Sequence, residues 1–269
     1  MRRLAVLAAA LLLTACVSAD PAVVSRAVQA TLAAMPTPTP IVVVVTVVRR
    51  PDGVPTATPP PPTETAAPEP TAAPTTPAPA DAAAPTGLPA FADDFSQPGA
   101  WSLGEDAVQR TELADGQFAF TLKEPDQFRF IYDVTRRARN FHAALTGRGQ
   151  ACRFRDRYGL IFRVQDSANY YQFEVDCDGR YRLAKVVDGT LTALKDWTPD
   201  PAVAAGPGAV NALAVRAEGD RLAVFVNGAR VFEAADASFA EGSFGLYVGS
   251  SPAAGFTALF DDFRVWALP

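Results

Sequence analysis

Histidine is almost absent from this chain, whose 269 residues include only one, His142. A Ser-His-Asp triad or a metal site built from several histidines is therefore nearly excluded. An excess of positive charge is also lacking, because 24 basic residues stand against 29 acidic ones and the net charge is -5. That balance offers no basic surface for nucleic acid, and nucleic acid is not an expected partner.

Cysteine is scarce too, with three in the chain. Cys16 ends an apolar run near the N-terminus, whereas Cys152 and Cys177 lie in the C-terminal part. One isolated cysteine and an even pair are typical of an exported chain that carries a lipid anchor and a disulfide.

The N-terminus has the order of features of a bacterial export signal. Arg2 and Arg3 precede the apolar run 4–13, which is too short to span a bilayer. Leu13-Thr14-Ala15-Cys16 then resembles the lipobox of bacterial lipoproteins. The resemblance implies that residues 1–15 are a cleaved signal peptide and that lipid on Cys16 anchors the chain to the outer face of a bacterial membrane, in the cell envelope. An ordinary cleaved signal with an incidental cysteine is the alternative.

A stalk is expected between this anchor and the folded domain. Residues 16–34 are expected to contain the lipidated N-terminus and a short helix. Residues 35–89 consist mostly of Pro, Thr and Ala, which predicts an extended or disordered linker. One run inside it, Ile41 to Val48, is rich in β-branched residues and suits a strand. Prolines and arginines that oppose aggregation flank the run, and the sequence assigns it no function.

Residues 90–269 show period-two alternation and two-residue turns, which predict short antiparallel strands. Asn227-Gly228 is a strong hairpin signal, and Gly219-Asp220 is expected to close another turn. Pairing outward from Gly219-Asp220 places only apolar pairs on one face: Ala217 with Leu222, Val215 with Val224, and Leu213 with Val226. The expected register therefore agrees with burial.

A further hairpin is expected around residues 166–169. Pairing outward again gives an apolar face: Val164 with Tyr171, Phe162 with Phe173, Leu160 with Val175, and Tyr158 with Cys177. The opposite face carries Arg163, Gln172, Glu174 and Asp176. Many short strands without a convincing helix indicate an all-β antiparallel sandwich.

Several runs resemble concanavalin A-like (laminin G-like) jelly-roll domains. They are YGLIFRVQDSANYYQFEVDCDGRYRLAKVVDG, RLAVFVNGARVF, GSFGLYVG and FDDFRVW, after an opening FADDFSQPGAW that is similar to the family's first strand. The resemblance covers about Leu88 to Pro269 and implies a jelly-roll β-sandwich. Such domains serve as lectins, glycosidases, sensors and adhesive modules, so glycan or another cell-envelope polymer is an expected partner.

Glu174, Asp176 and Asp178 alternate along one strand and would share a face. They resemble the carboxylates of family 16 glycoside hydrolases, which implies a retaining hydrolase that uses Glu174 and Asp178. Three features oppose this activity: Asp stands where that family has Glu, Asp178 precedes Gly179 as a turn residue does, and tryptophans are missing near the motif. We therefore expect a non-enzymatic binding or structural module, with Arg163 beside Glu174 on a solvated face.

The expected ligand-binding residues are Arg163, Gln172, Glu174 and Tyr247. Exposed aromatic rings stack on sugar rings, so Trp101, Trp197 and Trp266 are further candidates, with packing in the core as the alternative.

Two structural sites are expected as well. Calcium, the one candidate cofactor, would be bound by Asp93, Asp94, Asp261 and Asp262 in the expected first and last strands. Protection of a sheet edge by charge is the alternative for these acids. Cys152 and Cys177 are expected to form a disulfide, because the register turns Cys177 toward the core and Cys152 lies just upstream of the same hairpin. Two free thiols are the alternative.

Overall fold

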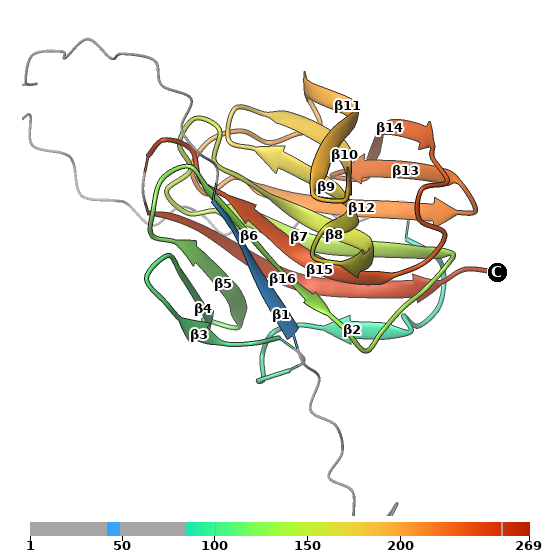
Figure 1. Ribbon diagram of the computed structural model, residues 1–269, viewed down its shortest axis with the longest axis horizontal. Helices are drawn as coiled ribbons and strands as arrows, with labels where there is room; N and C mark the ends of the chain where they lie inside the picture. The colour runs from blue at the N-terminus through green and yellow to red at the C-terminus, as the bar shows by residue number, and fades with distance from the viewer. Residues whose placement is uncertain (1–41, 49–83, 100, 254) are drawn as a thin grey trace, which may run out of the picture. The chain divides into compact units, whose positions relative to one another are not determined.

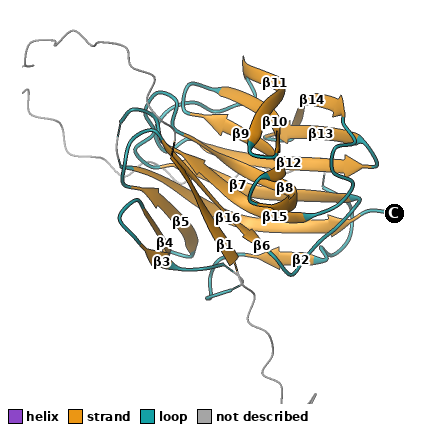
Figure 2. Cartoon of the chain, in the orientation of Figure 1, coloured by secondary structure: helices purple, strands orange, loops and turns teal. Residues whose placement is uncertain are grey.

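The computed structural model describes residues 42–48, 84–99, 101–253 and 255–269. All regular structure in these ranges is β-strand, as expected (Figure 2). The described residues include no helix long and apolar enough to cross a membrane. Cys16 and the short helix expected before residue 35 lie outside the described ranges.

The strands form two antiparallel sheets (Figure 1). The seven-stranded sheet contains, in spatial order, β1 (Val42–Val48), β6 (Gln127–Asp133), β15 (Ser243–Gly249), β8 (Arg157–Asp166), β9 (Asn169–Asp176), β10 (Arg180–Val187) and β11 (Thr190–Pro199). The nine-stranded sheet contains β14 (Ala229–Ala235), β13 (Arg221–Val226), β12 (Val210–Glu218), β7 (Phe141–Gly149), β16 (Phe256–Ala267), β5 (Gln117–Leu122), β4 (Gln109–Ala114) and β3 (Gly104–Glu105), with β2 (Phe91–Asp93) paired to β16.

The main apolar core lies between the two sheets. Leu160 and Phe173 of the seven-stranded sheet join Phe141 and Leu213 of the nine-stranded sheet in one buried cluster. Along β8, β9 and β12, alternate residues belong to this core, because side chains alternate between the faces of a strand. The predicted jelly-roll β-sandwich is confirmed.

Two hairpins show how far local turn chemistry determines the register. The pairing predicted from Gly219-Asp220 is confirmed, with Val215 opposite Val224 in β12 and β13. The pairing predicted for β8 and β9 is wrong by two residues, since Leu160 lies opposite Phe173. A bulge causes the shift: the ladder is irregular after Phe162, and Arg163 has a φ of 47°. Because the shift is even, β9 and the part of β8 up to Phe162 keep their predicted faces. Val164, beyond the bulge, is a correction: it belongs to the cluster on the opposite face, with Ile161.

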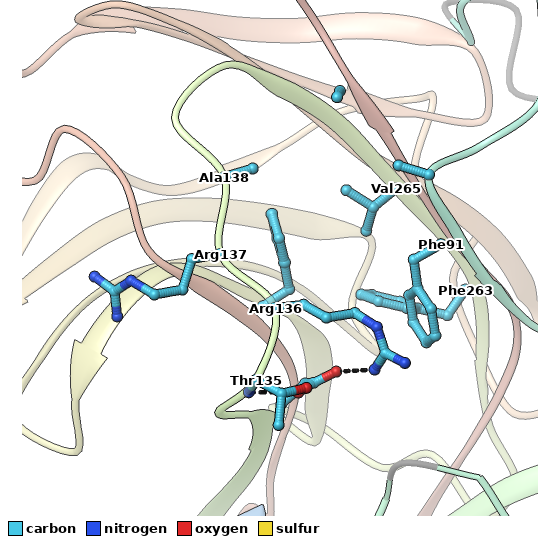
Figure 3. A pocket seen from close by; sticks show the side chains of 11 residues that line it. Phe91, Thr135, Arg136, Arg137, Ala138, Phe263 and Val265 are labelled. Atoms are coloured by element: carbon cyan, nitrogen blue, oxygen red, sulfur yellow. Dashed lines mark hydrogen bonds and ion pairs between the residues drawn. The ribbon is translucent and has the colours of Figure 1, made fainter. Parts of the chain in front are cut away.

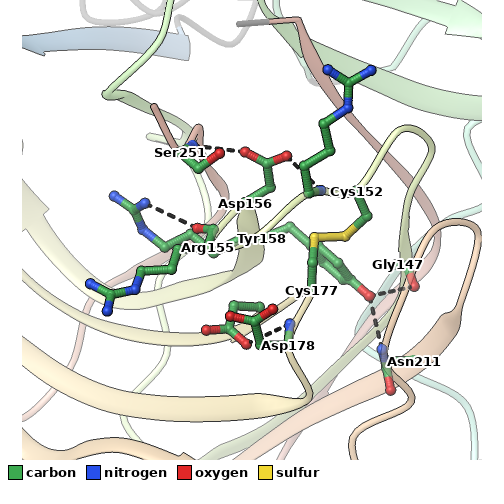
Figure 4. The surroundings of a disulfide bond; sticks show 12 residues. Gly147, Cys152, Arg155, Asp156, Tyr158, Cys177, Asp178, Asn211 and Ser251 are labelled. Atoms are coloured by element: carbon green, nitrogen blue, oxygen red, sulfur yellow. Dashed lines mark hydrogen bonds between the residues drawn. A yellow bond between two sulfur atoms is a disulfide. The ribbon is translucent and has the colours of Figure 1, made fainter. Parts of the chain in front are cut away.

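The predicted disulfide joins Cys152 and Cys177, whose Cα atoms are 5.6 Å apart (Figure 4). The loop between Cys152 and β8 is also fixed by Asp156, which is 1% exposed. One carboxylate oxygen of Asp156 accepts a hydrogen bond from the Arg153 amide at 2.9 Å, and the other accepts one from the Ser251 amide at 2.7 Å. These contacts determine where β8 begins, at Arg157.

The predicted stalk contains a strand. Val42–Val48 forms β1 and pairs with β6 over its whole length. The β-branched character of this run is the reason that it suits a strand.

Candidate functional site

One face of the seven-stranded sheet gathers the charged and aromatic residues, and we call it the site face. It is the face that points away from the nine-stranded sheet. On β9, Gln172, Glu174 and Asp176 alternate with the core residues Phe173 and Val175. Aromatic residues of β6, β9 and β15 form a second cluster on this face: Phe130, Tyr132, Tyr170 and Tyr247, with Phe128 packed against them.

Cross-strand register brings the site-face residues together in rows. One row runs across four strands: Tyr247 on β15, Gly159 on β8, Glu174 on β9 and Arg182 on β10. A side chain at Gly159 would meet the Phe173 carbonyl oxygen at 2.0 Å, so that only glycine fits there.

Arg157 extends into this row from the adjacent one, where it lies opposite Gly249 and Asp176. Its Nε is 3.3 Å from Oε2 of Glu174, and its guanidinium lies 6.0 Å from the centroid of the Tyr247 ring. Burial alone would lower the pKa of Arg157, but Tyr247 and Glu174 outweigh it and raise the pKa. The guanidinium is therefore firmly held as a cation.

Glu174 is the centre of the charged network. Its side chain is 0% exposed, whereas those of Arg157 and Arg182 are 19% and 15% exposed. Arg182 Nε donates a hydrogen bond to Oε1 of Glu174 at 2.6 Å. A buried carboxylate thus holds two guanidinium groups that reach the surface.

Asp176 forms the second buried carboxylate. Arg180 pairs with its Oδ2 at 2.5 Å, and the amides of Asp178 and Arg180 donate to its Oδ1 at 3.1 and 3.0 Å. Burial raises the pKa of Asp176 although Arg180 opposes the rise. Asp178 differs, because its side chain is 51% exposed in the turn after β9. The prediction that Asp178 is a turn residue is confirmed.

An indole ring lies beside this network. The Trp197 ring of β11 has the guanidinium of Arg182 at 4.8 Å from its centroid and that of Arg180 at 5.5 Å. Such contacts between cations and an aromatic face hold the guanidinium planes in place. Trp101, by contrast, belongs to the core and donates a hydrogen bond to Asp93.

Gln172 lies on the same face and is 1% exposed. Among the described residues, its Nε2 atom has no hydrogen-bond partner. A buried amide donor without a partner is costly, so a group that accepts its hydrogen bond would be stabilising here.

The structure thus brings together three of the four predicted ligand-binding residues: Gln172, Glu174 and Tyr247. The prediction that Arg163 binds ligand is wrong. Arg163 lies in the bulge, and its guanidinium donates hydrogen bonds to the carbonyl oxygens of Phe239, Arg139 and Gly219. The expected solvated face is also wrong, since Glu174 and Asp176 are buried.

Sequence reasoning missed Arg157 and Arg182 as members of the site. The turn at Asp178-Gly179 gave no usable signal for either residue. Pairing outward from these two residues places Leu183 opposite Glu174, whereas the structure places Arg182 there.

Of the four acids predicted to bind calcium, Asp93 and Asp94 lie at the end of β2, and Asp261 and Asp262 lie on β16. These two strands pair, as predicted. Each carboxylate group has a local partner: Asp93 accepts from the Trp101 indole, Asp94 from Ser96, Asp261 from the Asp262 amide, and Asp262 pairs with Arg264. Within the described ranges, no three metal-ligating side chains form a group. Calcium binding stays a prediction that a metal titration would test.

A separate cavity of about 370 Å³ contains none of the site-face residues (Figure 3). Phe91, Phe263 and Val265 form its apolar wall. The guanidinium of Arg136 lies 4.1 Å from the Phe91 ring centroid and pairs with Asp133. Because Arg136 and Asp133 already pair with each other, this cavity presents fewer hydrogen-bonding groups to a hydroxyl-rich ligand than the site face does.

Comparison with known proteins gives one family match. Residues 92–265 match the model of the 3-keto-alpha-glucoside-1,2-lyase-like domain, also described as a 3-keto-disaccharide hydrolase domain. No curated protein matches the sequence. The matched range covers more than half of the chain and includes every residue of the site face named above.

Three solved structures illustrate the fold. A Bacillus subtilis protein of unknown function with a galectin-like fold has 12% identity and a TM-score of 0.50, over 67% of this chain and 96% of that one. The carbohydrate binding module CBM66 from Bacillus subtilis has 23% identity and a TM-score of 0.47, over 55% and 86%. The GH43 BlXynB protein from Bacillus licheniformis has 15% identity and a TM-score of 0.49, over 66% and 39%.

These structures are similar in fold, whereas the family match bears on function. The family match corrects one expectation. The sequence was interpreted as a non-enzymatic module, and that interpretation is wrong because the family that matches residues 92–265 is described by a lyase activity.

Proposed function

Because the chain belongs to the 3-keto-alpha-glucoside-1,2-lyase-like domain family, we propose that its β-sandwich is an enzyme that cleaves 3-keto glycosides at the site face. One observation supports this location above all. Two buried carboxylates, Glu174 and Asp176, lie on one strand under three partly exposed guanidinium groups, with aromatic rings on either side. Cation, carboxylate and ring are the groups that bind and polarise a sugar.

The chemistry that the family description suggests needs a base and an electrophile. A ketone at C3 acidifies the proton on C2 of the sugar. When a base removes that proton, the electron pair forms the C1–C2 double bond and the alkoxide on C1 departs. The alkoxide takes up one proton, so that the products are an unsaturated ketone and an alcohol, and no further reactant is consumed.

We assign the base to Asp176. Burial raises the pKa of this carboxyl, and a higher pKa makes a carboxylate a stronger base at neutral pH. Arg180 covers Asp176, but its side chain is 22% exposed and long enough to move aside. Arg157 and Arg182 would stabilise the negative charge that develops on the C3 oxygen, and Glu174 positions both.

Asp176→Asn is expected to lower the rate of this cleavage by a factor of about 100 or more, the usual contribution of a general base. The substrate is a disaccharide α-glucoside oxidised at C3, and the measurement is the absorbance of the unsaturated ketone together with the released alcohol. Asp178→Asn is the matched control, because it makes the same change two residues away in an exposed turn. Equal rates for both variants would contradict the assignment, and no cleavage by the wild type would contradict the activity.

We also propose that the protein is exported and held on a bacterial membrane by lipid on Cys16. The Leu13-Thr14-Ala15-Cys16 motif supports this. The disulfide supports export, because disulfides persist in oxidising compartments.

Cys16→Ser is expected to move the protein from the membrane fraction to the soluble fraction, because no acyl chain can then be attached. The measurement is fractionation of cells followed by detergent extraction of the membranes. A variant that still fractionates with membranes and is extracted intact by detergent would refute the anchor.

A further inference from the structure

The β-branched run within the predicted stalk forms an edge of the folded domain. All of β1 pairs with β6, from Val42 opposite Asp133 to Val48 opposite Gln127. On its other side β6 pairs with β15. In the order of the seven-stranded sheet, β6 would therefore be the edge strand if β1 were absent.

Each of the two strands would be a hazard without the other. A free β6 would present a row of unpaired backbone groups, which is a template for the addition of strands from other molecules. A free Val42–Val48 would expose a run of high β-propensity and no charge, which is the signature of aggregation. Pairing covers the edge of β6 and fixes residues 42–48 in the sheet. β1 becomes the new edge strand, and Pro40 and Arg49 flank it in the sequence, as residues that oppose edge-to-edge association do.

We propose that residues 42–48 are a structural strand that the stalk donates to its own domain in order to close the edge of β6. Residues 42–48 and the domain from Ala84 onward are then separated by 35 residues of sequence. A chain of that length reaches at most roughly 120 Å, which is ample for β1 and the rest of the sheet to belong to one molecule.

The occupant is the same chain and not a second copy. A tethered strand has an effective concentration of about a millimolar when its linker is flexible. A second copy at micromolar concentration competes poorly with a strand that is covalently attached. Closure of the edge in this way also leaves β6 unable to accept a strand from another molecule.

Hydrogen exchange of the full-length chain, measured at the amides of Gln127–Asp133, tests the proposal. In an antiparallel pair, successive residues of a strand direct their amides to opposite sides. Of Val44→Pro and Val45→Pro, one therefore removes a hydrogen bond to β6 and the other is tolerated. Thr56→Pro, outside β1, is a control that leaves both strands untouched.

The disruptive proline is expected to lower protection by about ten-fold or more at those β6 amides that pair with β1. The β6 amides that pair with β15, and those of β8, should keep their protection, which shows that the domain is still folded. Unchanged protection in both proline variants would overturn the proposal. Protection that depends on protein concentration in the wild type would also overturn it, because a second copy would then supply the strand.

Discussion

Glu174→Gln is expected to lower the free energy of unfolding by about 3 kcal/mol, the lower end of the range for removal of one partner from a buried ion pair. The carboxylate is 0% exposed and contacts both Arg157 and Arg182. Glutamine has nearly the same shape but no charge, so the two guanidinium groups would remain close together without the anion between them. Because both cations are partly exposed, water recovers some of the loss, and we expect no larger value.

Urea unfolding at neutral pH measures this change, and Glu218→Gln is the matched control. Glu218 accepts two hydrogen bonds from Arg216, at 3.0 and 2.9 Å, but the two side chains are 42% and 39% exposed. The same substitution there is expected to cost a few tenths of a kcal/mol, about the value of an exposed pair. Equal losses at the two positions would show that burial of Glu174 does not strengthen its interactions.

If the face of β9 were solvated, as expected from the sequence, Glu174→Gln and Glu218→Gln would cost the same small free energy of unfolding. The alternation along β9 does predict that Gln172, Glu174 and Asp176 share a face, and it does so whatever the register. Burial of that face does not follow from alternation, because polar side chains are usually a sign of exposure. Here the carboxylates are buried under the side chains of arginines from β8 and β10.

The bulge at Arg163 explains why the predicted register of β8 and β9 is wrong by two residues. Two-residue turns gave the correct register for β12 and β13 because their residues tolerate positive φ, as Asn227 and Gly228 do in the next hairpin. Arginine at a φ of 47° is unusual and has no local signal. Its three hydrogen bonds to distant carbonyl oxygens stabilise that conformation, and they depend on the fold.

The residues of the site were also only partly predictable from local sequence patterns. The sequence supplied the carboxylates and Tyr247, but the place of Arg157 depends on Gly249, which lies opposite it on β15. A Cβ at Gly249 would lie 2.5 Å from the guanidinium carbon of Arg157. Contacts between strands that are distant in sequence follow from topology, which alternation along single strands does not provide.

Removal of the disulfide is expected to lower the free energy of unfolding by roughly 3 kcal/mol, the chain-entropy value for a loop of this size. Cys152 and Cys177 are separated by 25 residues, and the loop contains the whole of the β8–β9 hairpin. The half-cystines are 6% and 8% exposed and belong to the core. Next to them, the Tyr158 hydroxyl donates to the Gly147 carbonyl at 3.2 Å and accepts from Asn211 at 2.9 Å (Figure 4).

The comparison uses the wild type with and without reductant and the double variant Cys152→Ser, Cys177→Ser. The reduced wild type and the double variant should unfold at the same, lower urea concentration, and reductant should leave the variant unchanged. Thiol labelling of the unfolded, unreduced domain is expected to find no reactive group at either position. Because Asp156 fixes the same loop independently of the disulfide, the reduced protein should still fold. Two reactive thiols in the unreduced domain would contradict the bond, and equal stability with and without reductant would contradict its contribution.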